Sequence, residues 1–227
     1  MDRKNVLDRD IWCRASPFLI YVFFMILAEL LSRSGWGEHE LRLLYAVRIA
    51  AVAGLLWVLR SVYVELRLPR DAGIATWGVA VVAGVAVFVA WISLNAGWMV
   101  IGTSAGFDPR SGDGSIDWVM AIIRLAGAAL VVPLMEELFW RSFLMRWIAK
   151  HDFLAVEPAR VGLKAFVFSV VFFAFEHNLW LAGLFAGVVY SLLYMRSGTL
   201  WSPILAHTVT NGLLGVWVIY TGNWSYW

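Results

Sequence analysis

The sequence predicts an all-α protein that crosses a membrane several times, and two observations support this. Of its 227 residues, 61% are hydrophobic and only 15% are charged, whereas a soluble globular domain carries about 45–50% apolar and about 25% charged residues. The apolar residues also gather in long segments, and a helix needs about 20 residues to cross a bilayer. We expect helices because every backbone amide in lipid must be paired internally. These properties exclude a cytosolic enzyme, a nucleic-acid-binding protein and a disordered protein.

Seven apolar segments define the expected transmembrane helical bundle, with eight spans as the alternative count. The first segment, Pro17–Leu31, is expected to remain uncleaved because it contains Glu29 and lacks a small-x-small cleavage site. No internal repeat or second-domain boundary is visible, so residues 1–227 are predicted to form a single integral-membrane domain. The remaining segments are Leu43–Leu59, Ile74–Ile101, Trp118–Met135, Ala165–Phe175, Leu179–Tyr194 and Pro203–Tyr220.

The distribution of charge predicts that the N-terminus lies inside. Most of the 18 Lys and Arg residues fall on the N-terminal side of the predicted membrane, and only Arg33, Arg42 and Arg110 fall on the other side. Such a bias places the N-terminus inside, the C-terminus outside and an odd number of spans between them. The turn-rich segment Gly102–Asp117 is the clearest outer loop. Tryptophans that form an interfacial belt are expected at positions 36, 98, 118, 147, 201, 224 and 227.

Several polar side chains fall inside the predicted spans. A charged group at the centre of a span costs roughly 2.5–3.5 kcal/mol on insertion scales. Each of these polar side chains therefore needs a structural or functional explanation. Most of them lie in the second half of the chain. They are Glu29, Arg48, Asn95, Arg124, Glu136, Glu137, Arg141, Glu176, His177, His207 and Asn211.

The first polar cluster contains Glu136, Glu137 and Arg141. Adjacent residues of a helix point about 100° apart, so the two carboxylates face different neighbours. Arg141 follows Glu137 by one helical turn, where an ion pair forms readily. That pairing makes Glu137 structural and leaves Glu136 free to act. The alternative is an interfacial helix end with ordinary charges.

Two further clusters follow on other predicted helices. His177 ends an aromatic apolar segment, where an interfacial histidine without a catalytic role is the alternative. His207 and Asn211 are four residues apart, so their side chains share one helix face. A polar pair that joins two helices is the alternative for them. Together the clusters supply a carboxylate, two imidazoles and an amide, which can activate water and stabilise an oxyanion during amide hydrolysis.

The ordered motifs Glu136-Glu137-x-x-x-Arg141, Phe173-x-x-x-His177 and His207-x-x-x-Asn211 resemble the CPBP family. This family comprises the type II CAAX prenyl endopeptidases and the bacteriocin-processing or immunity proteins of the Abi family. The resemblance covers about Trp118 to Leu214, and the chain length is similar to that of the CAAX-protease-related proteins found beside bacterial exosortases. It implies a multi-span intramembrane protease with its catalytic core at about 118–214.

The resemblance also implies roles for the six residues. Glu136 is the general base that activates water, supported by Glu137 and Arg141. His177 positions the water or acts as a second acid–base group, while His207 and Asn211 form the oxyanion-stabilising pair. A glutamate-type mechanism without a cofactor is expected. Zinc is the alternative, because two histidines and a glutamate are possible zinc ligands.

The depth of these groups in the membrane sets a condition on the fold. Glu136 lies near the inner end of its helix if the helix stops at Met135, whereas His177 lies far along the next one. The groups meet only if the fourth helix continues through Trp147 as one long tilted or kinked element, or if the following helix starts later.

The sequence leaves two other classes of function open. One is a non-catalytic scaffold or immunity factor with a protease-like fold, and the other is a proton-coupled transporter. For the protease, the expected partners are membrane lipids and a protein or peptide substrate, lipidated or not, that is cut near its C-terminus or in its leader. The expected location is the bacterial inner membrane. Neither the substrate nor the oligomeric state follows from the sequence.

Overall fold

All seven predicted apolar segments lie in helices of the protein, apart from the last residues of the third and Leu179, which precedes α8 as its N-cap. The structure, a computed structural model, describes residues 3–68, 73–104 and 106–227. Single 3-10 turns at Val64–Leu66, Gly97–Met99, Phe153–Ala155, Pro158–Arg160 and Trp224–Tyr226 lie in the connections and the C-terminal segment. The helices are α1 (Arg3–Arg33), α2 (Glu38–Leu59), α3 (Ile74–Ser93), a long helix (Trp118–Ala149), α7 (Leu163–Phe175), α8 (Trp180–Ser197) and α9 (Trp201–Thr221).

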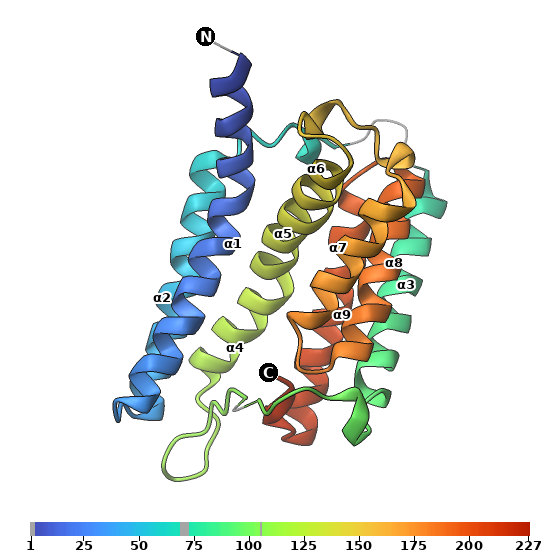
Figure 1. Ribbon diagram of the computed structural model, residues 1–227. Helices are drawn as coiled ribbons and strands as arrows, with labels where there is room; N and C mark the ends of the chain where they lie inside the picture. The colour runs from blue at the N-terminus through green and yellow to red at the C-terminus, as the bar shows by residue number, and fades with distance from the viewer. Residues whose placement is uncertain (1–2, 69–72, 105) are drawn as a thin grey trace.

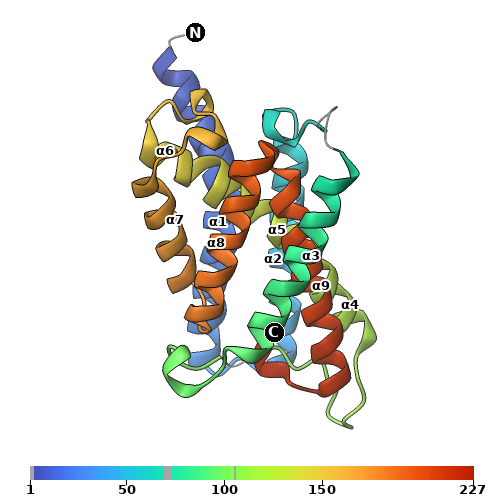
Figure 2. The ribbon, with the colours of Figure 1, turned by 90° about the vertical axis from the view of Figure 1, so that its right-hand side faces the viewer.

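The helices form an up-and-down bundle around the long helix. α1 packs along α2, α7 along α8 and α3 along α9, and the long helix runs obliquely between these groups (Figures 1 and 2). The N- and C-termini lie at opposite ends of the bundle (Figure 1). The described residues contain no β-strand, only one isolated bridge between Arg110 and Ile116.

The outer surface of the bundle is apolar, as lipid requires. Large side chains such as Phe23, Val82 and Val216 are more than half exposed on their helices. In the described part of the chain, five helices are long and apolar enough to cross a membrane: α1 from Arg9, α2, α3, the long helix and α9. The protein is therefore a multi-pass integral membrane protein. The exact number of spans and the inside position of the N-terminus stay predictions.

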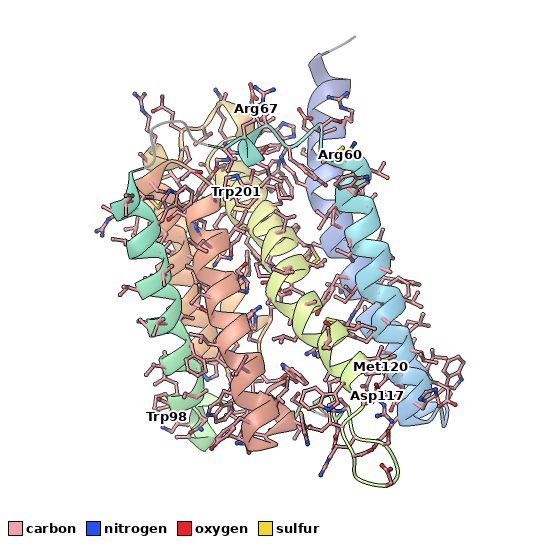
Figure 3. The ribbon with its side chains drawn as sticks, turned by 180° about the vertical axis from the view of Figure 1, so that it is seen from behind. Arg60, Arg67, Trp98, Asp117, Met120 and Trp201 are labelled. Atoms are coloured by element: carbon pink, nitrogen blue, oxygen red, sulfur yellow. The ribbon has the colours of Figure 1, made fainter. Side chains whose placement is uncertain are left out.

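The ends of the bundle carry different side chains (Figure 3). Arg60, Arg67 and Trp201 lie at the end that holds the N-terminus, while Trp98 and Asp117 lie at the opposite end. Both tryptophans make contacts across the connections: the Trp201 indole donates to the Leu66 carbonyl, and the Trp98 carbonyl accepts from the Trp180 indole. This distribution agrees with an interfacial tryptophan belt and with basic residues gathered at one membrane face.

The bounds of the first and third apolar segments differ from those of the helices that contain them. The first helix begins at Arg3 and contains Pro17, because the polar N-terminal segment continues the helix beyond the apolar stretch. The third helix ends at Ser93 and not at Ile101. Asn95 lies just beyond that end and donates from its side chain to the Ile92 carbonyl, a local bond typical of chain turns. The predicted Gly102–Asp117 loop is non-helical wherever it is described.

The fourth predicted helix continues beyond Met135 to Ala149, a total of 32 residues. Its α-helical parts, α4 (Trp118–Ala126), α5 (Val132–Glu136) and α6 (Arg146–Ala149), alternate with two π-helical segments, Gly127–Val131 and Glu137–Met145. At 1.5 Å per residue it is about 48 Å long, so it crosses the bundle obliquely. The condition for the three polar clusters to meet is therefore fulfilled.

Pro133 lies two residues after the end of the first π-helical segment without breaking the helix. In a π-helix the carbonyl of residue i accepts from the amide of residue i+5, so the donor expected for the Ala128 carbonyl is residue 133. Proline has no amide hydrogen. The side chain of Asn211 replaces it, because Nδ2 donates to the Ala128 carbonyl at 2.8 Å.

A buried polar network fastens the long helix to the connection between α2 and α3. The guanidinium of Arg14 donates to both oxygens of Glu65 at 2.7 Å, and Ser142 also donates to Glu65. Arg146 lies 3.6 Å from the same carboxylate. Burial alone would raise the pKa of Glu65, but the hydrogen bonds and charge of Arg14, together with Ser142, hold it below its usual value.

We expect Glu65→Gln to lower the stability of the purified protein by about 3–5 kcal/mol at pH 7, because it breaks a buried ion pair. Since the pKa of Glu65 is lowered on folding, its carboxylate contributes stability above its ordinary pKa of 4.5 and loses it as the pH falls through the lower folded value. The difference between wild type and variant should therefore shrink at acid pH. Thermal unfolding in detergent at several pH values measures it. Glu157→Gln, at an exposed loop position, is the control, and an equal pH dependence in the Glu65 variant would contradict the assignment.

Candidate active site

A cavity of about 170 Å³ lies inside the bundle, between the long helix and α7, α8 and α9. Four of the six predicted site residues line it: Glu136 from the long helix, His177 from the end of α7, and His207 and Asn211 from α9. Its volume has room for several water molecules, each of which occupies about 30 Å³ in the liquid. The remaining lining residues are Tyr21, Trp91, Arg124, Ala128, Val132, Phe173, Ala186, Tyr190, Thr210, Leu214, Tyr226 and Trp227.

Glu136 is the carboxylate of the cavity. Its side chain is only 5% exposed, and its buried Oε2 atom has no hydrogen-bond partner. Glu176, Glu137 and Arg141 are the charged groups that act on it electrostatically. A buried carboxylate oxygen without a partner is costly, so Glu136 requires either a proton or a water molecule. A carboxylate that faces a polar cavity can obtain either the proton or the water molecule.

Glu137 points away from the cavity into a fully buried contact. Its Oε1 atom accepts from Arg141 Nη1 at 3.1 Å and from His207 Nδ1 at 3.0 Å. The charge of Arg141 keeps Glu137 an acceptor, which fixes the Nδ1–H of His207 towards it. Glu137 therefore joins the long helix to α9 and orients the His207 ring, whose Nε2 atom forms no hydrogen bond with the residues that the structure describes.

His177 is held by its own helix and by aromatic rings. Its Nδ1 atom lies 2.8 Å from the Phe173 carbonyl. Because a carbonyl only accepts, Nδ1 carries the hydrogen and Nε2 is a free acceptor. The rings of Phe173 and Trp91 lie 4.8 and 5.2 Å from the imidazole. His177 thus offers a lone pair with a fixed orientation.

The Phe173 ring also links the other groups of the site. Its centroid lies 6.5 Å from that of His207, and the Arg141 guanidinium lies 4.2 Å from it. A cation above an aromatic face is attracted to the ring, which compensates in part for the burial of Arg141. The phenylalanine of the motif that contains His177 therefore has a structural role between the three polar clusters.

On α9, His207 and Asn211 face the cavity from successive turns. Tyr190 of α8 stacks on His207 with a centroid distance of 4.9 Å, and its hydroxyl donates to Thr210. Asn211 uses one hydrogen of its amide for the Ala128 carbonyl. The amide carries two hydrogens, so one remains available.

The structure therefore brings all six predicted residues together, four at the cavity wall and two, Glu137 and Arg141, directly behind it. Glu176, which had no assigned role, accepts from the Trp140 indole at 3.0 Å. Sequence reasoning gave no role to Trp91, Tyr190 and Arg124. Arg124 had a detectable signal, a charge within a predicted span. The two aromatic residues had none, because aromatic side chains are common in apolar helices.

The side chains of the site also bear on metal binding. Among residues 3–68, 73–104 and 106–227, no three His, Cys, Asp or Glu side chains are arranged to bind one. The bonds of His207 Nδ1 to Glu137 and of His177 Nδ1 to a backbone carbonyl orient the two rings but leave their Nε2 atoms unoccupied. The metal-independent mechanism stays a prediction.

Comparison with known families agrees with this site. The model of the Rce1-like type II CAAX prenyl endopeptidases matches residues 118–213, a segment that includes all six site residues. A comparison with curated proteins finds no match, and neither does one with solved structures. The resemblance predicted from the motifs is confirmed over this segment, because residues 118–213 match the model of the Rce1-like CAAX proteases. The family indicates a membrane-embedded protease that acts on a protein or peptide.

We expect Arg141→Met to destabilise the protein by about 3–5 kcal/mol, because it leaves the buried charge of Glu137 without its cation. The double variant Glu137→Leu/Arg141→Met should lose less, since it removes both charges. Thermal unfolding of the detergent-solubilised Arg141→Met, Glu137→Leu and double variants measures the three losses. If the double variant lost as much as both single variants combined, the buried ion pair would not couple these residues.

Proposed function

We propose that the protein is an intramembrane endopeptidase in which a water molecule, activated by Glu136, hydrolyses a peptide bond. One observation carries the proposal: Glu136 of the long helix, His177 of the turn after α7, and His207 and Asn211 of α9 line the same cavity. A base, an acceptor and two candidate donors around a space large enough for water are the requirements for amide hydrolysis.

In the proposed first step the water lies between Glu136 and His177. It donates one hydrogen to the Glu136 carboxylate and the other to Nε2 of His177, which holds no hydrogen when Nδ1 donates to Phe173. Its oxygen lone pair then points away from both groups. Glu136 takes the proton as the oxygen attacks the peptide carbonyl.

The carbonyl oxygen becomes negative in this step and needs donors. Asn211 supplies its second amide hydrogen. His207 supplies Nε2–H in its imidazolium form, whose extra proton comes from the solvent of the cavity before the substrate binds and returns there after product release. Glu137, which accepts from Nδ1, stabilises this imidazolium. Donors fixed before the reaction typically contribute a factor of about 10²–10³ each to the rate. The intermediate then collapses, the C–N bond breaks, and Glu136 returns its proton to the leaving amine.

The proposed substrate is a membrane-associated protein or peptide, lipidated or not, that is cut near its C-terminus or in its leader. The apolar outer surface keeps the protease in the bilayer, where such a segment can reach it by lateral diffusion. We propose the bacterial inner membrane as its location, with the N-terminus inside and seven spans, as the charge distribution predicts.

We expect Glu136→Gln to abolish cleavage while the fold survives, because glutamine has nearly the same shape but cannot take a proton from water. The assay incubates detergent-solubilised protein with a random decapeptide library and identifies products by mass spectrometry. Glu157→Gln, at an exposed loop position, should cleave like the wild type.

Three results would overturn the proposal. Equal cleavage by the wild type and the Glu136 variant would remove Glu136 as the base. The absence of cleavage by the wild type, of this library and of membrane-inserted peptides alike, would favour a non-catalytic scaffold. A proton flux in vesicles that depends on Glu136, without cleavage, would favour a transporter.

A further inference from the structure

Two arginines inside the bundle have no carboxylate partner. Arg48 of α2 and Arg124 of the long helix form no ion pair among the described residues, and the Nε atom of each is buried without a hydrogen-bond acceptor. Their guanidinium carbons both lie 4.6 Å from the centroid of the Tyr45 ring. The two positive charges are therefore within about 9 Å of each other. Like charges repel each other strongly inside the bundle, where water screens them little, and a bound anion would relieve the repulsion.

Aromatic groups are the neighbours that hold these charges in place. The Arg48 guanidinium also lies 4.4 Å from the Tyr21 ring, and that of Arg124 lies 5.5 Å from the Phe107 ring. Ring faces attract cations but neutralise no charge. An arginine that served only to join helices would be expected to bind a carboxylate, as Arg14 and Arg141 do in this protein.

The arginine pair lies where two cavities meet. Arg124 lines both the catalytic cavity and a second cavity of about 550 Å³ between α1, α2 and the loop before the long helix, and Arg48 lines the second one. Tyr21 and Trp227 also line both cavities. A ligand that extends from one cavity to the other would therefore pass the arginines.

One face of the long helix connects the pair with the catalytic glutamate. Arg124, Ala128, Val132 and Glu136 follow one another at intervals of four residues, and all of them line the catalytic cavity. The small side chains at 128 and 132 leave space along this face. At 1.5 Å per residue, Arg124 and Glu136 lie about 18 Å apart along the helix. An extended peptide covers that distance in about five residues.

The acidic residues of the second cavity do not neutralise the pair. Glu29 is paired with Arg33 at 2.8 Å, and Asp108 with Arg110. Glu38 lies ten residues before Arg48 on α2, about 15 Å away along the helix. The region around Arg48 and Arg124 therefore remains positive.

We propose that Arg48 and Arg124 bind a carboxylate of the peptide substrate about five residues from the bond that is cut. This inference rests on the proposed protease function. The carboxylate is either the C-terminal carboxylate of the substrate or an acidic side chain. Arginine binds carboxylates with paired, charge-assisted hydrogen bonds. A peptide fits the site better than a lipid headgroup, because the pair lies on the path to Glu136 inside the bundle.

The test measures binding of fluorescein-labelled random decapeptide pools to immobilised, detergent-solubilised protein. One pool has a free C-terminal carboxylate and no acidic residues, the second is the same pool with a C-terminal amide, and the third is amidated but contains one glutamate. We expect the free-acid pool, the glutamate pool or both to bind at least tenfold more tightly than the amide pool. The better of the two identifies the source of the carboxylate.

Three variants decide whether the arginines are responsible. Arg48→Gln and Arg124→Gln should each reduce the preference to about one, while Arg124→Lys should retain part of it. Arg48 lies outside the catalytic helix, so its variant tests the inference even if Arg124→Gln fails to fold. Arg60→Gln, at the other end of the bundle, should keep the full preference. A wild-type protein without any preference, or a preference unchanged in Arg48→Gln, would overturn the inference.

The outcomes also separate this inference from the proposed function. An arginine-dependent preference without any cleavage would retain the carboxylate site and reject the protease. Cleavage of the library without any preference for carboxylate-containing peptides would retain the protease and reject the carboxylate site. Arginine-dependent binding of phosphatidylglycerol nanodiscs, with no peptide preference, would assign the pair to a lipid headgroup and reject the peptide site.

Discussion

The buried contact among Glu137, Arg141 and His207 is the interaction on which the rest of the site depends. It places two opposite charges in a region with almost no access to water, where each charge alone would be very costly. The same carboxylate binds the imidazole of α9. The long helix and α9 are thereby fixed to each other, and Glu136, the next residue along the helix, is directed into the cavity. Glu137 thus has a structural role that positions its neighbour Glu136 for the proposed chemistry.

The backbone of the long helix adds a second constraint. Its π-helical segments adjoin Pro133 and Glu137, and such segments are frequent at functional sites. The first of them leaves the Ala128 carbonyl without a backbone donor, and Asn211 supplies one. The first π-helical segment therefore helps to fix Asn211, a side chain proposed for the oxyanion site.

The sequence predicted the helices and the six-residue site because both leave direct signals. Lipid requires long apolar segments, and a polar side chain within them is conspicuous. The sequence did not predict the contact between Glu137 and His207, 70 residues apart, since it depends on how two helices pack. It also did not predict the π-helical segments, or the rings of Trp91 and Tyr190 against the imidazoles. The start of α1 was missed because hydropathy marks where a helix is apolar and not where it begins.

The central claim is that Glu136 faces a water-filled cavity within the bundle. Cysteine accessibility tests it most directly in a Cys13→Ala background, since Cys13 is the single cysteine. Glu136→Cys and Met135→Cys are compared for their rate of reaction with a small, water-soluble methanethiosulfonate reagent. Met135 is completely buried next to Glu136 and does not line the cavity. We predict that the cysteine at position 136 reacts at least tenfold faster than the one at 135. Equal rates at the two positions would contradict the cavity and the hydrolysis that depends on it.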